Sequence, residues 1–460
     1  MNSFLNPTIL REYDIRGIVG DTFSEEVVES LGRAFGTRIK RAGGHSVAVG
    51  YDGRLSSPGL ADAAIRGLSA CGLKVYQTGR GPTPMLYYAT YALEADAGLM
   101  ITGSHNPPDY NGIKMMMSGL SFFGQDIQDL GRIVEAEDFE TGEGSVHEHI
   151  MLEAYVERVL ADFKPGRDLN IAWDAGNGVA GEAMTMICDQ LPGEHCLLYA
   201  DIDGTFPNHH PDPTVEANLA DLKLVVEAEK CDLGIAFDGD GDRIGVVDSQ
   251  GRVLWGDQLM VIWAQEILSR NPGSTIIADV KASQVLFDEV ARMGGKPVMW
   301  KTGHSLIKSK MKELASPFAG EMSGHIFFKD GYYGFDDALY AAIRLISILS
   351  QTEQSLDSMF DAMPKMINTP EIRFECPEER KFDVAEEVKV RLNGVEGIQV
   401  IDVDGVRVVS KDGWWLLRAS NTQPVLVARC EANDEAGLER LKATLVEQLK
   451  ASDITPPDDF

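Results

Sequence analysis

The 460-residue sequence is short of positive charge. It contains 42 Lys and Arg residues against 71 Asp and Glu residues, so its formal net charge at pH 7 is -29. Such a charge disfavours binding to nucleic-acid backbones and to anionic membranes, and we expect neither as a partner. The same charge repels phosphorylated small molecules. A site for one of them must therefore be built locally, from clustered Arg, Lys, hydroxyl and backbone N–H groups.

Cysteine pairs and uninterrupted apolar segments are also missing. The six cysteines include no C-x-x-C pair, which argues against a zinc ribbon and against a disulfide framework: Cys71, Cys188, Cys196, Cys231, Cys376 and Cys430. The first residues lack the apolar core of a signal peptide, and Arg344 interrupts the apolar stretch at 338–349. We therefore expect buried thiols and a cytoplasmic protein.

The length predicts several domains, because at about 100 to 150 residues per domain the chain divides into three or four. Before residue 364, short β-branched runs alternate with helix-like segments, which is typical of βαβ units and mainly parallel sheets. Beyond it, the pattern predicts a smaller α+β domain with antiparallel strands. The predicted domains are residues 1–149, 150–252, 253–364 and 365–460.

Three segments of the α/β region share one plan. Each has a predicted strand that runs into an aspartate, followed by a helix, a second strand and a third run with a polar end. The first strands are 47–51, 170–173 and 275–278, and their aspartates are Asp52, Asp174 and Asp279. The second strands are 74–77, 196–199 and 297–300, and the third runs end in TGSHN, DGDGD and GEMSGH. Because ligands of open α/β sheets gather at the carboxyl ends of strands, we expect one shared site.

The segment TGSHNPPDYNGIK predicts a nucleophile. Ser104 follows a predicted strand and a glycine, the sequence Asn-Pro-Pro at 106–108 stiffens the loop, and Lys114 lies downstream. We expect Ser104 to be exposed in this loop. It does not form the hydrolase elbow G-x-S-x-G, because Thr102 and Asn106 stand where that motif needs glycines. An isolated serine at such a place more often caps a helix or a turn.

The segment DGDGDR predicts a metal site. Asp238, Asp240 and Asp242 alternate with glycines, so a turning loop can bring three carboxylates together. Carboxylates 4 Å apart repel by about 4 kcal/mol per pair at an effective dielectric of 20, and a hard cation such as Mg²⁺ offsets this repulsion. An EF-hand is excluded, because Arg243 and Ser249 stand where it needs glycine and a carboxylate. A solvated acidic turn is the simpler alternative.

Three further loops carry ligand-binding residue types. The turn RASNTQP offers donors that suit a phosphate dianion: Arg418, Ser420, Asn421 and Thr422. The loops KTGHS (301–305) and GEMSGH (320–325) add cationic, hydroxyl and carboxylate groups that suit sugar hydroxyls. Taken singly, each of these is more often an ordinary loop.

Other functions remain as alternatives. GNGVAG at 176–181 matches the dinucleotide-binding pattern G-x-G-x-x-G, and Asp201 lies about twenty residues further on. A dehydrogenase, however, would leave the serine loop, the aspartates and the arginine turn without a joint purpose. No Walker loop is present, because Gly295 and Lys296 run into Pro297. A metal-dependent phosphatase and a non-catalytic sugar-phosphate-binding protein would use the same residues.

The motifs EYDIRG (12–17), TGSHNP, DGDGDR, GEMSGH and RASNT occur in this order over the chain. In these motifs and their spacing it resembles the α-D-phosphohexomutase superfamily, and within it the bacterial phosphomannomutase/phosphoglucomutase group, over essentially its whole length. The resemblance implies four domains around a central cleft. It implies Ser104 as the phosphorylated nucleophile, with one Mg²⁺ per chain held by the three aspartates and the serine phosphate.

The resemblance also implies the substrate contacts. Glu321 and Ser323 would bind sugar hydroxyls, and the RASNT turn would hold the phosphate that is not reacting. The remaining implied contacts are Tyr13, Arg16, Lys114, Arg243, Lys281, His304 and His325. Among them Lys114 and His325 are candidates for proton transfer, and Arg16 and Arg243 are further catalytic candidates.

The implied reaction has two phosphoryl transfers. Phospho-Ser104 gives its phosphoryl group to a mannose or glucose monophosphate, the bisphosphate turns end for end, and the other phosphate returns to the serine. Glucose 1,6-bisphosphate would act as the primer. The expected partners are small hexose phosphates, and a monomer is the favoured state.

Overall fold

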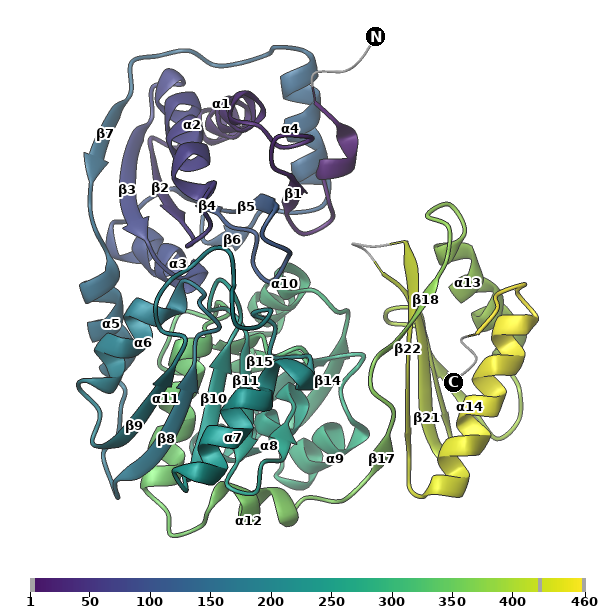
Figure 1. The fold of residues 1–460 in the computed structure, drawn as a ribbon. Helices are drawn as coiled ribbons and strands as arrows, with labels where there is room; N and C mark the ends of the chain where they lie inside the picture. Colours follow the sequence, from purple (N-terminus) through teal and green to yellow (C-terminus); the bar gives the residue numbers. More distant parts are fainter. Residues whose placement is uncertain (1–4, 421–423, 457–460) are drawn as a thin grey trace.

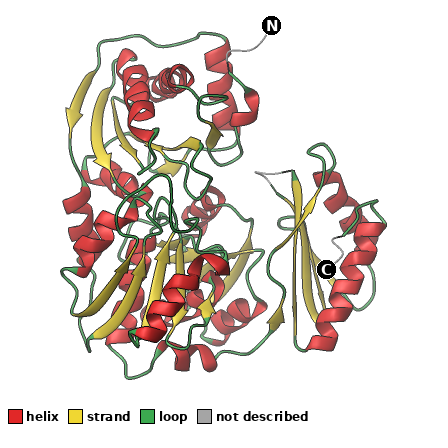
Figure 2. Cartoon of the chain, viewed as in Figure 1, coloured by secondary structure: helices red, strands yellow, loops and turns green. Residues whose placement is uncertain are grey.

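The described residues form four β-sheets, and we call the regions around them the first to fourth domains (Figure 1). The computed structural model describes residues 5–420 and 424–456. The first three domains are α/β layers, whereas the fourth is an antiparallel sheet with helices on one face (Figure 2). The predicted fold class, three similar α/β domains with mixed or parallel sheets and a smaller α+β domain, is confirmed.

The first domain contains a seven-stranded sheet of order β1-β5-β4-β2-β3-β7, with β6 paired to β5. Its strands are β1 (Ile15–Ile18), β2 (Ser46–Tyr51), β3 (Lys74–Arg80), β4 (Ala97–Ile101), β5 (Tyr110–Met117), β6 (Leu120–Ser121) and β7 (Ser145–Glu148). Its helices are η1 (Pro7–Ile9), α1 (Glu25–Arg41), α2 (Ser57–Ala70), α3 (Thr83–Ala92) and α4 (Gln125–Glu135).

The second domain has a five-stranded sheet of order β12-β11-β10-β8-β9. Its strands are β8 (Leu169–Asp174), β9 (Gly193–Leu198), β10 (Leu233–Phe237), β11 (Ile244–Asp248) and β12 (Val253–Leu254). Its helices are α5 (Leu152–Leu160), α6 (Ala180–Cys188), η2 (Glu216–Leu219) and α7 (Ala220–Ala228). Because β12 pairs with β11, this sheet continues just past the boundary predicted at residue 252.

The third domain has a four-stranded sheet of order β14-β13-β15-β16. Its strands are β13 (Thr275–Asp279), β14 (Lys296–Trp300), β15 (Phe318–Gly320) and β16 (Ile326–Phe328). Its helices are α8 (Gly256–Arg270), α9 (Gln284–Arg292), α10 (His304–Leu314), α11 (Ala338–Ser350) and α12 (Leu356–Asp361). In the described part of the chain, no helix combines the length and the apolar character that a membrane crossing needs.

The fourth domain has an antiparallel sheet of order β17-β22-β21-β20-β19, with β18 also paired to β22. Its strands are β17 (Ile367–Asn368), β18 (Ile372–Glu375), β19 (Gln399–Ile401), β20 (Val406–Ser410), β21 (Gly413–Ala419) and β22 (Val425–Ala432). Its helices, α13 (Lys381–Leu392) and α14 (Glu435–Lys450), cover the outer face of the sheet (Figure 1).

The repeated plan of the first three domains is confirmed by strand pairing. In each domain a central strand (β2, β8 or β13) pairs in parallel with the next strand and with the third. In each, the third strand then pairs with an antiparallel fourth strand: β4 with β5, β10 with β11, and β15 with β16. The predicted polar loops therefore lie at equivalent sheet edges.

The buried apolar clusters show which domains share a packed core. One cluster of buried side chains runs through the second and third domains and reaches α3 of the first. The fourth domain has its own core, on the face of β21 that carries Trp415 and Leu417. On the opposite face, Trp414 and Leu416 contact Val280 of the third domain. Since side chains alternate along a strand, Arg418 lies on this second face, toward the third domain.

Candidate active site

The serine loop follows β4 and is held in place by Arg54. Ser104 itself has a positive φ of 49°, a conformation that non-glycine residues adopt rarely. The buried guanidinium of Arg54 donates to four carbonyl oxygens of this loop, those of Ser104, Asn106, Pro107 and Tyr110, at 2.5–3.0 Å. The sequence analysis missed Arg54, although it follows the strand-end residue Asp52 by two positions.

Ser104 is buried, which corrects the expectation of an exposed loop. Only 2% of its surface is accessible. The cause is the metal loop of the second domain, since a Cβ atom on Gly239 would lie 2.4 Å from the carbonyl oxygen of Ser104. The serine Oγ lies 3.1 Å from Oδ2 of Asp238. The predicted nucleophile and the predicted metal loop are thus in direct contact across a domain boundary.

The metal loop brings three buried carboxylates together, as predicted. Oxygens of Asp238, Asp240 and Asp242 lie within 4.8 Å of one another, and all three residues are fully buried. Burial, together with the charges of Asp242 and Asp240, raises the pKa of Asp238 well above its ordinary value. Oδ1 of Asp240 has no hydrogen-bond partner among the described residues. A set of oxygen donors with a buried unpaired carboxylate oxygen fits a hard divalent cation.

Lys114 contributes a fixed charge to this loop. Its Nζ donates to Oδ2 of Asp240 at 2.7 Å and to Oδ2 of Asp242 at 2.5 Å. Burial opposes the charged form, but Asp240 and Asp242 outweigh it and hold the pKa of Lys114 well above its ordinary value. Lys114 is therefore a protonated ammonium that offsets part of the carboxylate repulsion.

His325 and His304 form a stacked pair with opposite tendencies. Their ring centroids lie 5.5 Å apart. Burial lowers the pKa of His325, but Asp242 at 3.3 Å and Glu321 at 2.9 Å more than compensate and raise it to about 9. For His304, burial and the neighbouring Lys308 outweigh the effect of Asp242 and hold its pKa well below the ordinary value. One imidazole is charged and its neighbour is neutral.

The remaining predicted residues approach from all four domains. Tyr13 donates from its hydroxyl to the carbonyl of Thr302 at 2.9 Å, and Glu321 accepts from the amide of Gly303 at 2.5 Å. Arg16 donates to Asn106 of the serine loop at 2.5 Å, and Oγ of Ser323 lies 3.3 Å from the ring of His325. Arg243 is half-buried and Ser420 is buried, and Asn421 and Thr422 lie outside the described residues.

Two acidic residues that the sequence analysis missed join the fourth domain to the third. Asp404 accepts from Nε of Arg418 at 2.9 Å and from the amide of Thr302 at 3.1 Å. Glu371 accepts from Nζ of Lys281 at 2.9 Å. Arg418 and Lys281 are both predicted substrate contacts, so a carboxylate orients each of these side chains before any substrate binds. Neither acidic residue belongs to a recognisable motif.

The glycine-rich segment GNGVAG has a structural role that leaves no room for a dinucleotide. The amide of Val179 donates to the carbonyl of Gly239 at 3.1 Å. A Cβ atom on Gly178 would lie 3.0 Å from Gly239, and one on Gly181 would lie 2.0 Å from the carbonyl oxygen of Ala200. The glycines thus allow close packing against the metal loop and the segment that follows β9, which accounts for the pattern without a nicotinamide cofactor.

Comparison with known proteins covers the whole length of the chain. Four models of phosphoglucomutase/phosphomannomutase match it: alpha/beta/alpha domain I at residues 7–141, domain II at 153–251, domain III at 255–366 and the C-terminal domain at 371–448.

Among similar proteins, a phosphomannomutase/phosphoglucomutase of Pseudomonas aeruginosa is 47% identical, with 99% of this chain and 98% of that protein covered. A phosphoglucomutase of Neisseria gonorrhoeae is 43% identical, with 94% and 95% covered. A crystal structure of a phosphoglucomutase/phosphomannomutase family protein from Burkholderia thailandensis superposes with a TM-score of 0.93 at 42% identity, with 99% of each chain covered.

Proposed function

Because the chain belongs to the phosphoglucomutase/phosphomannomutase family, we propose that Ser104 carries the phosphoryl group that the enzyme transfers. The protein interconverts hexose 1-phosphates and hexose 6-phosphates and is a phosphotransferase. The observation that carries the proposal is the distance of 3.1 Å between Oγ of Ser104 and the carboxylate of Asp238. A hydroxyl at this place would hold its phosphate against the three aspartates.

Asp238, Asp240 and Asp242, with the phosphate on Ser104, would hold one Mg²⁺ per chain. The family depends on magnesium, and the donor set fits it, since carboxylate and phosphate oxygens are the ligands this ion prefers. When bound, the ion offsets charge on the transferring phosphoryl group. Lys114 keeps two of the carboxylates in place beside it, as its hydrogen bonds to Asp240 and Asp242 support.

His325 would exchange the proton of the reacting sugar hydroxyl. Its ring is fixed by carboxylates on both nitrogens, Asp242 on one side and Glu321 on the other. Because the ring carries both protons, it would act first as a general acid, and as a general base after it has given up one of them. Arg16 and Arg243 would place further positive charge near the phosphoryl group. Phosphoryl transfer gives the protein little covalent chemistry to do, so its catalysis depends on positioning and electrostatic stabilisation.

The sugar and its distant phosphate would be held by the third and fourth domains. We assign the hydroxyls to Glu321 and Ser323 and the phosphate that is not reacting to the turn with Arg418. The other substrate contacts in this proposal are Tyr13, Lys281, His304, Ser420, Asn421 and Thr422. A shared set of hydroxyl contacts suits both mannose and glucose phosphates. Glucose 1,6-bisphosphate would be the primer. The chain would act as a monomer.

A coupled assay tests this substrate proposal. If Glu321 and Ser323 bind hydroxyls that glucose and mannose share, the 2-hydroxyl that distinguishes them is weakly recognised. We expect kcat/KM for mannose 1-phosphate and glucose 1-phosphate to differ by less than about a thousandfold, roughly 4 kcal/mol. A larger ratio would contradict the shared contacts. Inorganic phosphate measured in the same assay separates a mutase, which releases almost none, from a phosphatase, which releases it stoichiometrically.

A further inference from the structure

The three repeated domains each end their central strand in a buried aspartate. In the first domain Asp52 accepts from the amide of Gly103, next to Ser104, at 2.9 Å. In the third, Asp279 accepts from the amide of Met322, next to Ser323, at 3.0 Å. Each of these aspartates therefore holds its own functional loop directly. The equivalent residue of the second domain, Asp174, is 1% exposed, and in the described part of the chain its side chain bonds to Gly176 and His209 rather than to the metal loop.

Asp174 instead joins two other segments. Its Oδ1 accepts from the amide of Gly176 at 2.8 Å, and its Oδ2 lies 3.0 Å from Nε2 of His209. The segments that begin at these contacts, 176–179 and 208–213, are also tied to each other, because Asn208 donates to Asn177 at 2.8 Å. In the second domain, segments 176–179 and 208–213 thus lie between Asp174 and the metal loop, whereas Asp52 and Asp279 contact their loops directly.

Both segments form a hydrogen bond with the backbone of Gly239, the residue between Asp238 and Asp240. The amide of Gly239 donates to the carbonyl of Pro211 at 3.1 Å, and its carbonyl accepts from the amide of Val179 at 3.1 Å. A Cβ atom on Gly239 would lie 3.3 Å from Pro211 and 2.4 Å from the carbonyl of Ser104. Both backbone hydrogen-bonding groups of this residue are therefore set by the two segments that Asp174 connects.

His209 is placed to be the charged part of this connection. Its Nε2 faces Asp174 and its Nδ1 lies 3.0 Å from the carbonyl of His210, so only a doubly protonated ring donates to both. Burial lowers the pKa of His209, but Asp174 outweighs it and the net shift is upward. The edge of the ring contacts Tyr199, whose hydroxyl donates to Asp221 at 2.6 Å. Asp174, Tyr199 and Asp221 are thus the charged and titratable side chains that act on His209.

We propose that Asp174 and His209 are positioning residues that set the spacing of the metal-binding carboxylates through the backbone of Gly239. This inference rests on the proposed metal site. Neither residue would touch the metal or the substrate. Their loss should loosen the loop at 238–242 and weaken divalent cation binding, since residues that orient metal ligands typically change metal affinity by about 10- to 100-fold.

The test uses Mn²⁺ as the probe, with its binding followed by electron paramagnetic resonance of the free ion. We expect His209→Ala and Asp174→Asn to raise the Kd for Mn²⁺ at least about tenfold over the wild-type chain. His209→Gln keeps one donor but not the charge, so its Kd for Mn²⁺ should lie between those of the wild type and of His209→Ala. Tyr199→Phe is the matched control, because it removes a hydrogen bond beside the same ring without touching Asp174 or Gly239, and its Kd should stay unchanged.

Hydrogen exchange of the metal-free protein provides the second measurement. The peptide that contains Gly239 should exchange faster in His209→Ala and Asp174→Asn than in the wild type or in Tyr199→Phe. If either variant does not fold, His209→Gln carries the comparison. Unchanged Mn²⁺ affinity together with unchanged exchange would overturn the inference. A wild-type chain that binds no Mn²⁺ would refute the metal assignment itself, and the exchange rates would then still decide whether Asp174 and His209 hold the loop.

Discussion

At the scale of single residues, the serine loop depends on a side chain that does no chemistry. Arg54 is 2% exposed and donates to four carbonyl oxygens around Ser104. Asp52 lies 3.4 Å from its Nε and offsets its charge. The two terminal nitrogens of the guanidinium reach all four acceptors, whereas a lysine ammonium offers three donors from a single nitrogen and cannot replace them all. The left-handed backbone at Ser104 is maintained by this arrangement.

Arg54→Lys should therefore cost both stability and activity. Breaking a buried, hydrogen-bonded charge pair typically costs about 3–5 kcal/mol, so a partial loss of about 2–4 kcal/mol is expected in urea unfolding. Arg66→Lys is the matched control: Arg66 pairs with Glu29 and is half exposed, and such pairs contribute about 1 kcal/mol or less. Equal effects of the two substitutions would contradict the role assigned to Arg54.

Single residues also mark the limit of sequence analysis. Ser104 and the three aspartates were predictable because their own side chains form a chemical pattern. Arg54 acts on backbone carbonyls, which leave no pattern of side-chain types, and it was missed. The burial of Ser104 was mispredicted for a related reason: the loop that covers it belongs to another domain, and the sequence around Ser104 contains no information about that contact.

At the scale of elements, strand β21 has two roles: one face packs in the core of the fourth domain, and the other packs this domain against the third. Its sequence GWWLLRA alternates between two faces. Leu417 packs in the core of the domain, whereas Leu416 contacts the third domain together with Trp414 and Val280. Arg418 follows on the same face as Leu416. The alternation could be predicted from the sequence. Because both faces carry large apolar residues, however, the sequence did not indicate which face packs in the domain core and which contacts the third domain.

Leu416→Ala and Leu417→Ala form a matched pair, since both leucines are fully buried. Leu417→Ala should destabilise the fourth domain by about 2–5 kcal/mol through the cavity it leaves, and raise hydrogen exchange in α13 and α14. Leu416→Ala should leave exchange in these helices near the wild-type rate, raise it around Val280, and lower kcat/KM. Indistinguishable exchange patterns in the two variants would show that β21 does not separate the two functions.

At the scale of the whole molecule, four domains contribute to one site but are not equally joined. The first three share contacts between the serine loop, the metal loop and His325. The fourth reaches the site through a face of β21 and through two carboxylates, Asp404 and Glu371. The repeat within the first three domains was predictable from the sequence, because each copy has the same order of strands and polar loops. The sequence also predicted one shared site for these loops, but not the individual contacts that join them, such as that of Gly239 with Ser104.

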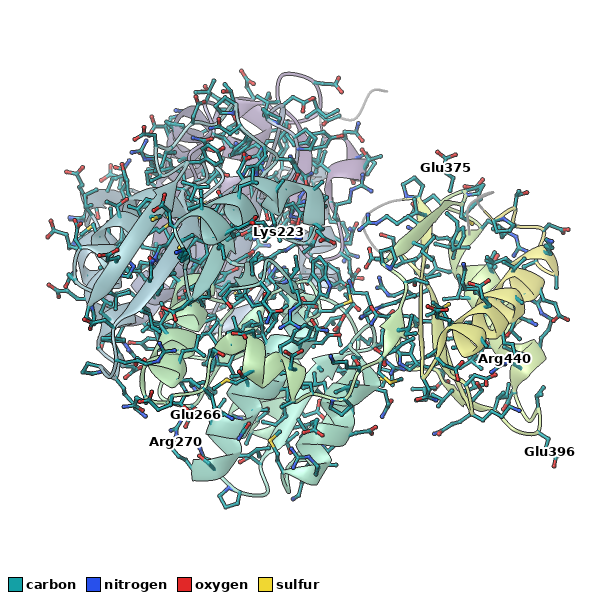
Figure 3. All side chains as sticks on the ribbon, turned by 60° about the horizontal axis from the view of Figure 1, so that its bottom comes forward. Lys223, Glu266, Arg270, Glu375, Glu396 and Arg440 are labelled. Atoms are coloured by element: carbon teal, nitrogen blue, oxygen red, sulfur yellow. The ribbon has the colours of Figure 1, made fainter. Side chains whose placement is uncertain are left out.

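Arg418→Ala tests whether one clamp serves both orientations of the bisphosphate. Each charge-assisted contact contributes about 1.5–3 kcal/mol, so kcat/KM should fall by roughly ten- to a hundredfold from the 1-phosphate and from the 6-phosphate alike. Arg440→Ala is the control, since Arg440 pairs with Asp412 on the outer surface of the same domain (Figure 3). Damage confined to one direction would mean that the two orientations use separate phosphate sites.

The most direct test of the mechanism is the intact mass of the resting enzyme, followed by peptide mapping before and after one turnover with an equimolar amount of isotope-labelled hexose monophosphate. We predict one additional phosphoryl group of about 80 Da on Ser104, which is given to the sugar and replaced by the labelled phosphate of the substrate in that turnover. Ser104→Ala should lack this mass and nearly all turnover. A Ser104→Ala variant with wild-type activity, or a fully active enzyme whose phosphate lies on another residue, would contradict the account.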